Sequence, residues 1–131
     1  MKTYAIRLTK GQDLKKELIK FTKENNLKAG CIISCAGHLT RATLRMADAR
    51  IIKDYEEEFE IVALSGTLCK DDVHLHVALS NKKGEMIGGH VKDNCLIGVT
   101  AEIVIGDLEN LEFRREFDNS TGYNELRIIK K

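Results

Sequence analysis

The amino-acid sequence predicts a single α+β domain, residues 1–131, in which one main helix packs on a largely antiparallel β-sheet. Three observations support this fold class. One segment has apolar residues at helical spacing, whereas much of the rest alternates between apolar and polar residues, as strands do. Short linkers rich in turn residues separate the alternating segments and suit hairpins. Only 5% of the residues are aromatic while 43% are hydrophobic, so Ile, Leu and Val must fill the core.

The N-terminal segment is expected to form a strand followed by the helix. Thr3–Leu8 alternates like a short strand, and Lys10–Asp13 forms a turn. Asp13 is a plausible N-cap, because a carboxylate there accepts a hydrogen bond from the first helical turn. The helix is expected from Leu14 to about Asn25, and its apolar stripe consists of Leu14, Leu18, Phe21 and Ile19.

Three shorter strands are expected before residue 56. Cys31–Ala36 forms a buried strand, and Ala36–His38 a turn. Arg41–Met46 alternates again, Arg50–Tyr55 is a further candidate, and Glu56–Glu58 is an acidic solvated turn.

The rest of the chain is expected to consist of strands joined by turns. One helix covers only one face of a sheet, so the other face would stay open unless a second subunit packs against it. The sequence therefore predicts oligomerisation through the sheet. The expected strands are Phe59–Leu68, Val73–Ser80, Glu85–Val91, Cys95–Ile105, Leu111–Phe117 and Asn124–Ile129, the last two joined by the turn Asp118–Gly122.

Three histidines fall on the polar faces of two neighbouring strands. His74 and His76 alternate with Val73, Leu75, Val77 and Leu79, and His90 precedes apolar Val91. If the two strands pair, three imidazoles converge, and such a set with an open fourth position is a good ligand shell for Zn²⁺ or a similar divalent ion. The alternative is a set of ordinary surface or interface histidines.

Two further polar residues are candidates for catalysis. Glu102 shares the polar side of its strand with Thr100, and Arg45 lies on the polar side of its own strand. Glu102 could orient an imidazole or take a proton from metal-bound water. Arg45 could bind a carboxylate or phosphate of a small anionic ligand. The alternative for each is a salt bridge between subunits.

Composition argues against several classes of protein. The formal net charge is +1, from 21 basic and 20 acidic residues, which lends no support to binding nucleic acid mainly through phosphate contacts. No apolar segment opens the chain or could span a membrane, so we expect a cytoplasmic protein with reduced thiols. The four cysteines lack Cys-x₂-Cys spacing and are expected to be buried free thiols.

Most of the chain resembles the plants and prokaryotes conserved (PPC) domain. The matching segments are Phe59–Leu68, His74–Ser80, Gly84, Gly88–Val91, Cys95 and Thr100–Ile105, with Ala42–Arg45 before them and Phe113–Asp118, Thr121–Tyr123, Glu125 and Leu126 after them. The resemblance implies a homotrimeric α+β fold. It also implies that His74, His76 and His90 match histidines thought to hold a metal ion in some prokaryotic members.

The resemblance leaves the function open between different classes. Plant members join this domain to AT-hook segments that enter DNA, and prokaryotic members are described as DNA-binding by association; this chain has no Arg-Gly-Arg AT-hook core. The first hypothesis is a non-enzymatic, trimeric DNA-binding or regulatory protein with a three-histidine metal site. The second is a metal-dependent enzyme acting on a small anionic substrate at the same histidines, and the third is a plain assembly module.

Overall fold

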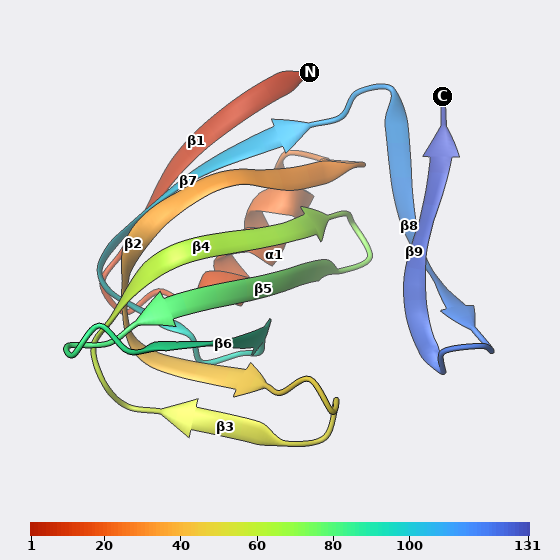
Figure 1. Ribbon diagram of the computed structural model, residues 1–131. Helices are drawn as coiled ribbons and strands as arrows, with labels where there is room; N and C mark the ends of the chain where they lie inside the picture. The colour runs from red at the N-terminus through yellow and green to blue at the C-terminus, as the bar shows by residue number, and fades with distance from the viewer.

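Seven strands form one strongly curved sheet, and the last two strands form a separate hairpin beside it (Figure 1). The computed structural model describes residues 1–131. Its elements are β1 (Lys2–Thr9), α1 (Leu14–Glu24), β2 (Gly30–Arg45), β3 (Ile52–Tyr55), β4 (Phe59–Leu68), β5 (Val73–Ser80), β6 (Met86–Val91), β7 (Leu96–Asp107), β8 (Leu111–Asp118) and β9 (Tyr123–Lys130).

All strand pairings are antiparallel, in the order β1-β7-β2-β4-β5-β6, with β3 added to β2. The end of β2 also pairs with β6, so the sheet curls back on itself. This confirms the predicted α+β class with a mostly antiparallel sheet. The curl matters for the site, because it brings the last residues of β2 beside β6.

The predicted turn at Ala36–His38 is wrong, because β2 runs without interruption through it. The register of β2 shifts against β7 on both sides of Leu39, and such irregularities bend a strand without ending it. Gly37 lies between two neighbouring strands, and a Cβ atom there would come within 2.4 Å of the carbonyl oxygen of Thr100. This glycine therefore marks a close approach of backbones inside a strand and not a turn.

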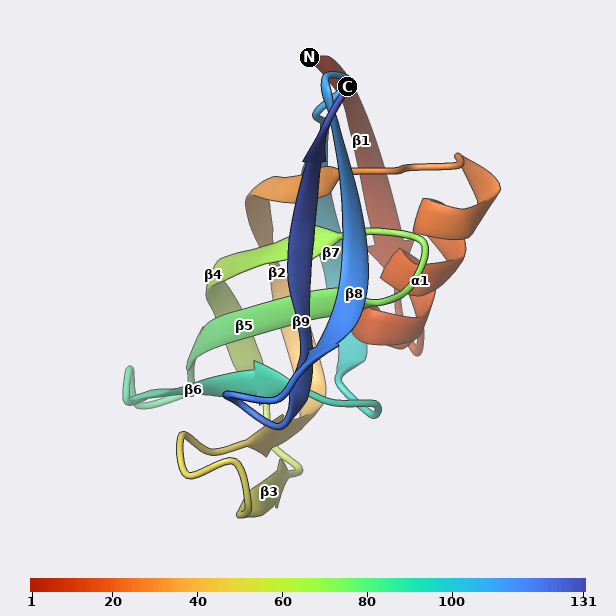
Figure 2. The same cartoon turned by 90° about the vertical axis from the view of Figure 1, so that its right-hand side faces the viewer.

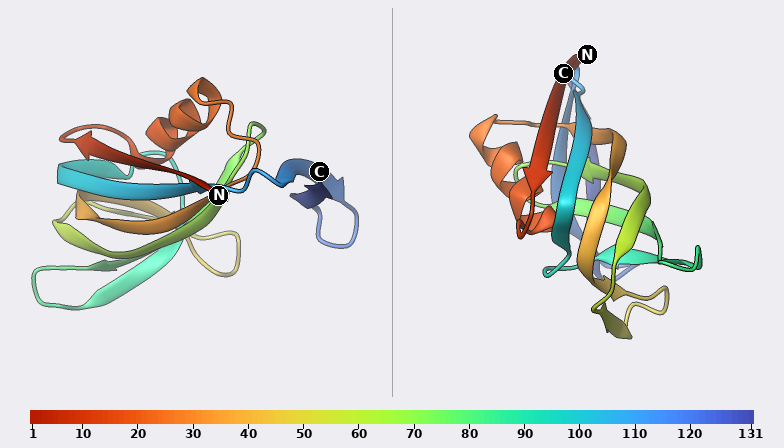
Figure 3. Two further views of the ribbon diagram at one scale, coloured as in Figure 1. Left: turned by 90° about the horizontal axis from the view of Figure 1, so that it is seen from above. Right: turned by 90° about the vertical axis from the view of Figure 1, so that its left-hand side faces the viewer.

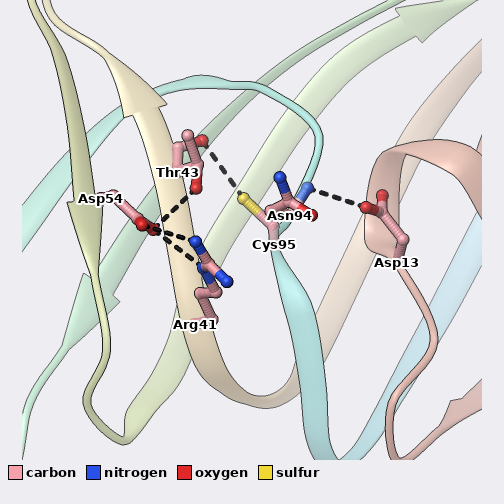
Figure 4. Close-up of polar contacts among 6 residues, drawn as sticks. All are labelled: Asp13, Arg41, Thr43, Asp54, Asn94 and Cys95. Carbon is pink, nitrogen blue, oxygen red and sulfur yellow. Dashed lines mark hydrogen bonds and ion pairs between the residues drawn. The ribbon is translucent and has the colours of Figure 1, made fainter.

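Helix α1 begins where the sequence predicts. The Oδ1 atom of Asp13 accepts a hydrogen bond from the backbone N–H of Lys16 at 3.0 Å, which confirms the N-cap. The other carboxylate oxygen accepts from the backbone N–H of Asn94 at 2.8 Å (Figure 4). One side chain thus holds the start of the helix against the loop before β7.

The core lies between α1 and the curved sheet. Leu14 and Leu18 of the predicted stripe are fully buried, Phe21 and Ile19 are partly buried, and Thr22 is buried as well. Figure 3 shows α1 along one side of the sheet, and no helix covers the opposite side. No helix of the chain has the length and apolar character needed to cross a membrane.

The β8–β9 hairpin docks on the end of the sheet through a small apolar cluster of its own. Phe113 packs there with Ala29 and Cys69, and its backbone N–H donates to the carbonyl of Lys28 at 2.9 Å. Figure 2 shows the hairpin running past the ends of β4 and β5. The hairpin therefore lies near the beginning of β5, the strand that carries His74 and His76.

Candidate metal centre

Strands β5 and β6 place the three histidines together. His76 is directly opposite His90 in the β5–β6 pairing, and His74 lies two residues away on the same face of β5. The intervening residues Leu75 and Val77 are buried in the core. The alternation predicted from the sequence is therefore present, and it turns the imidazoles away from the core.

The spacing of the imidazole nitrogens suits a single ion. The Nε2 atoms of His74 and His76 are 3.2 Å apart, and one ring nitrogen from each of the three residues lies within 4.8 Å of the others. Zn–N bonds of about 2.0–2.1 Å at tetrahedral angles would separate two ligand nitrogens by roughly 3.3–3.4 Å. The first pair is close to this separation, and the ligand nitrogen of the third imidazole lies within 4.8 Å of the other two.

An unsatisfied nitrogen gives a second indication of a missing partner. The Nδ1 atom of His90 is buried and has no hydrogen-bond partner. Buried polar atoms are nearly always paired, so an orphaned one needs an explanation. The donor set and this orphaned atom together fit a divalent ion held by imidazoles.

The glycines before His90 allow β6 to approach both of its neighbours. A Cβ atom at Gly88 would lie 2.6 Å from the carbonyl oxygen of Val77, and one at Gly89 would lie 2.9 Å from that of Arg45. Gly88–Gly89 thus permits close backbone contact beside the site.

The surroundings of His74 and His90 keep these two imidazoles neutral. Burial, as the largest cause, and the positive charge of Arg45, as the next, together lower the pKa of His90 to about 4. The pKa of His74 is also lowered, first by burial and then by the neighbouring His76 and by Arg115. Neutral imidazole is the form that binds metal, so both histidines are in the ligand state at neutral pH.

Only one of the two catalytic candidates lies at the histidines. Arg45, at the end of β2, is opposite His90 in the pairing of β2 with β6. It lines a cavity of about 460 Å³ together with the three histidines. Glu102 lies on β7, opposite Arg7 of β1 and Ala36 of β2, and it does not line that cavity. Strands β2 and β4 separate β7 from β5. Alternation shows which side of a strand a residue occupies, but it gives no lateral position in the sheet.

Several residues at the site were missed by sequence reasoning. The hairpin contributes Arg115, Tyr123 and Glu125 to the cavity wall, and α1 contributes Lys15. The pair Arg114–Arg115 has the composition of a solvated basic cluster, and no signal in the sequence says where the hairpin docks.

The cysteines do not join the histidines. All four are free thiols, and none belongs to the cluster of potential metal ligands. The Sγ atom of Cys95 lies 3.4 Å from the carbonyl oxygen of Thr43 (Figure 4), and burial raises the pKa of this thiol to about 11.

Known sequences match this chain along its length. The profile of the Plants and Prokaryotes Conserved (PCC) domain matches residues 1–109. The chain is 48% identical over 132 residues to the bifunctional protein GlmU of Synechococcus sp. strain JA-3-3Ab, covering 99% of this chain and 21% of that protein. It is 29% identical over 112 residues to the AT-hook motif nuclear-localized protein 8 of Arabidopsis thaliana, covering 79% of this chain and 29% of that protein. The chain thus spans less than a third of the length of either relative.

Solved structures share the fold beyond the part that the family profile covers. A hypothetical protein from Salmonella cholerae-suis superposes with a TM-score of 0.95 at 38% identity, covering 99% of this chain and 94% of that one. A metal-containing protein from Archaeoglobus fulgidus superposes with a TM-score of 0.83 at 30% identity, covering 97% and 94%. At such coverage the β8–β9 hairpin is part of the shared fold.

Proposed function

The chain belongs to the Plants and Prokaryotes Conserved (PCC) domain family, and from that premise we propose that it is a metal-binding regulatory protein. In this proposal His74, His76 and His90 hold one divalent ion, preferably zinc. The observation that carries the proposal is the convergence of three imidazoles from two paired strands, with ligand atoms within 4.8 Å of one another.

Two further points support a metal ion at this position, and the first of them favours zinc. Imidazole nitrogens suit zinc, and three of them leave a fourth coordination position for water or a ligand. The related Archaeoglobus fulgidus protein is described as metal-containing, at 30% identity. Bound zinc would supply a Lewis acid at the open position.

Elemental analysis of protein purified without an affinity tag or a chelator tests the proposal. We expect about one zinc ion per chain, the stoichiometry of a single three-histidine site. His76→Ala should lose the ion. His38→Ala, which removes a histidine that lies outside the cluster, should retain it. Wild-type protein that takes up no stoichiometric metal from zinc-containing buffer would refute the proposal.

We propose that the regulatory unit is a homotrimer, as the family resemblance implies. Exposed apolar side chains on three neighbouring strands support an interface on the sheet: Ile33 on β2, Val62 on β4 and Val99 on β7 are 47%, 55% and 67% exposed. A second copy packing there would remove this apolar surface from water.

Light scattering during size-exclusion chromatography tests the assembly. Val62→Asp places a charge in the proposed interface and should shift the mass from trimer toward monomer. The control is Lys82→Asp, in the turn after β5. It changes the formal charge more than Val62→Asp does, yet should leave the trimer intact. A monomeric wild-type protein at micromolar concentration would exclude the assembly.

DNA binding is a second candidate function, favoured by the similarity to an AT-hook motif nuclear-localized protein. The nearly balanced charge predicts few phosphate contacts, and therefore weak and salt-sensitive binding. An electrophoretic shift assay at moderate salt, with A·T-rich and random duplexes, tests it. A shift at micromolar protein supports direct binding, whereas its absence removes the DNA part and leaves the metal part untouched.

A further inference from the structure

The cavity beside the histidines is rich in positive charge. Its wall includes the cationic side chains of Lys15, Arg45, Lys92 and Arg115, against the carboxylates of Asp72 and Glu125. Four cations and two carboxylates leave a formal excess of two positive charges before any metal ion is counted. Since the chain as a whole carries a net charge of only +1, this charge is concentrated locally.

Arg45 lacks an acidic partner, unlike Arg41, Arg114 and Arg127. Arg41, four residues earlier on β2, forms a two-pronged ion pair with Asp54, and Arg127 pairs with Glu116. Arg45 forms no ion pair, and its Nε atom is buried without a hydrogen-bond partner. A guanidinium with free donors beside a cavity is suited to an anion that the cavity receives.

The neighbouring contacts hold both guanidinium groups at the cavity. The Arg45 guanidinium lies 5.9 Å from the centre of the Tyr123 ring, within the range of a cation–π contact. On the opposite wall, Nη2 of Arg115 donates to Oγ1 of Thr67 at 3.1 Å, and Thr67 is opposite His74 in the β4–β5 pairing. The histidines therefore lie between two positioned arginines, one from the sheet and one from the hairpin.

We propose that this cavity binds the phosphate group of a small phosphorylated molecule, beside the metal ion, through Arg45 and Arg115. The inference rests on the proposed metal site and names the ligand class of that site. A phosphate monoester carries nearly two negative charges at neutral pH and several terminal oxygens, so it can face an ion and two arginines at once. A cavity of about 460 Å³ is larger than one phosphate group needs, which leaves room for an organic part near Tyr123.

The hairpin contributes to this cavity from outside the segment that the family profile covers. Arg115, Tyr123 and Glu125 lie beyond residue 109, where the match to the family profile ends. The sheet supplies the metal ligands, and the hairpin supplies one arginine and the surface for the organic part. The organic part of the ligand would therefore contact the hairpin while the phosphate group faces the metal ligands.

Isothermal titration of the zinc-loaded protein with inorganic phosphate tests the inference, with glycerol 3-phosphate and malonate as parallel probes. We expect inorganic phosphate and glycerol 3-phosphate to bind saturably at one site per chain. Arg45→Gln should bind phosphate at least about tenfold more weakly, because it loses a charge-assisted hydrogen bond. Arg115→Gln should weaken binding in the same way. The matched control is Arg41→Gln on the same strand, which lies outside the cavity and should bind phosphate like the wild type.

The zinc content of each sample, measured before titration, separates the two proposals. Zinc-loaded wild-type protein that does not bind phosphate would refute the ligand and leave the metal site standing. Malonate bound as tightly as the phosphates would refute the phosphate class, and a loss of affinity in Arg41→Gln equal to that in Arg45→Gln would refute the role of the cavity. Protein without zinc would refute the metal site and this inference with it. Circular dichroism of each variant shows that it is folded.

Discussion

His76 and His90 face each other across β5 and β6, with ring centroids 5.5 Å apart. This opposition is a property of strand register, because a slip by one residue would turn a whole strand's side chains to the other face. The candidate metal centre therefore depends on the contacts that fix the position of β6, and these can be altered without touching a histidine.

Gly89→Ala should weaken metal binding through the backbone. Its Cβ atom would lie 2.9 Å from the carbonyl oxygen of Arg45 and 3.2 Å from the Leu44 side chain, so β6 must move away from β2 and carry His90 with it. We expect a loss of stability of about 1–3 kcal/mol, typical of overpacking, together with weaker zinc affinity in a chelator competition assay.

Gly84→Ala is the matched control for this prediction. Gly84 has a φ of +79° and open space around it, so alanine there costs about 1–2 kcal/mol of backbone strain without a steric clash. Zinc affinity should then stay at the wild-type level despite a similar loss of stability. Equal zinc affinities for the two variants would contradict the role assigned to Gly89.

The stability of the metal-free protein should fall as the pH is lowered from about 6.5 toward 4. The pKa of His90 is lowered to about 4 in the folded protein, against an ordinary value of about 6.5 in the unfolded chain. Between these pH values the unfolded chain binds more protons at residue 90 than the folded protein does, so acidification favours unfolding. Above pH 6.5 His90 is neutral in both states, and this loss of stability disappears. The lowered pKa of His74 acts in the same direction.

Urea unfolding at several pH values and one fixed protein concentration measures this effect. Carboxylates also lose stabilising contacts in acid, so the comparison is with His90→Asn, which lacks the titrating imidazole. The stability of the wild type should fall more steeply than that of the variant between pH 6.5 and 4. Parallel curves would show that His90 titrates normally.

The histidine cluster could be predicted from the sequence because it depends on local information. The alternation around His74 and His76 and the short linker before β6 were enough to place three imidazoles on one patch. The lateral position of Glu102 could not be predicted, because strand order is set by the whole fold and places β7 away from β5.

Two other features required the three-dimensional structure. The single long strand β2 contains Gly37, a residue that in isolation indicates a turn, yet here permits close contact with the neighbouring β7. Arg115 reaches the cavity because Phe113 anchors the hairpin against Ala29 and Cys69. Contacts between residues so distant in sequence leave no periodic signal.

Leu75→Ala should destabilise the protein strongly although it lies between two exposed histidines. Leu75 is only 1% exposed, and truncation of such a core leucine costs about 2–5 kcal/mol. Met86→Ala, at a side chain that is 54% exposed, should change stability by less than about 0.5 kcal/mol. Urea unfolding measures both. If zinc binds the folded state, adding zinc should raise the urea concentration at which half of the Leu75→Ala protein is unfolded.

Asp13→Ala and Asp13→Asn should differ in stability, because the two carboxylate oxygens have different partners. Alanine removes both the cap on the Lys16 N–H and the contact with the Asn94 N–H, and loss of a cap alone costs about 0.5–2 kcal/mol. Asparagine retains one oxygen for the cap but presents an NH₂ group to the second donor. We therefore expect the unfolding midpoint of Asp13→Asn to lie between those of the wild type and Asp13→Ala. Equal midpoints for the two variants would mean that the contact to Asn94, and not the helix cap, carries the stabilisation, so that residue 13 acts mainly by holding the loop between β6 and β7.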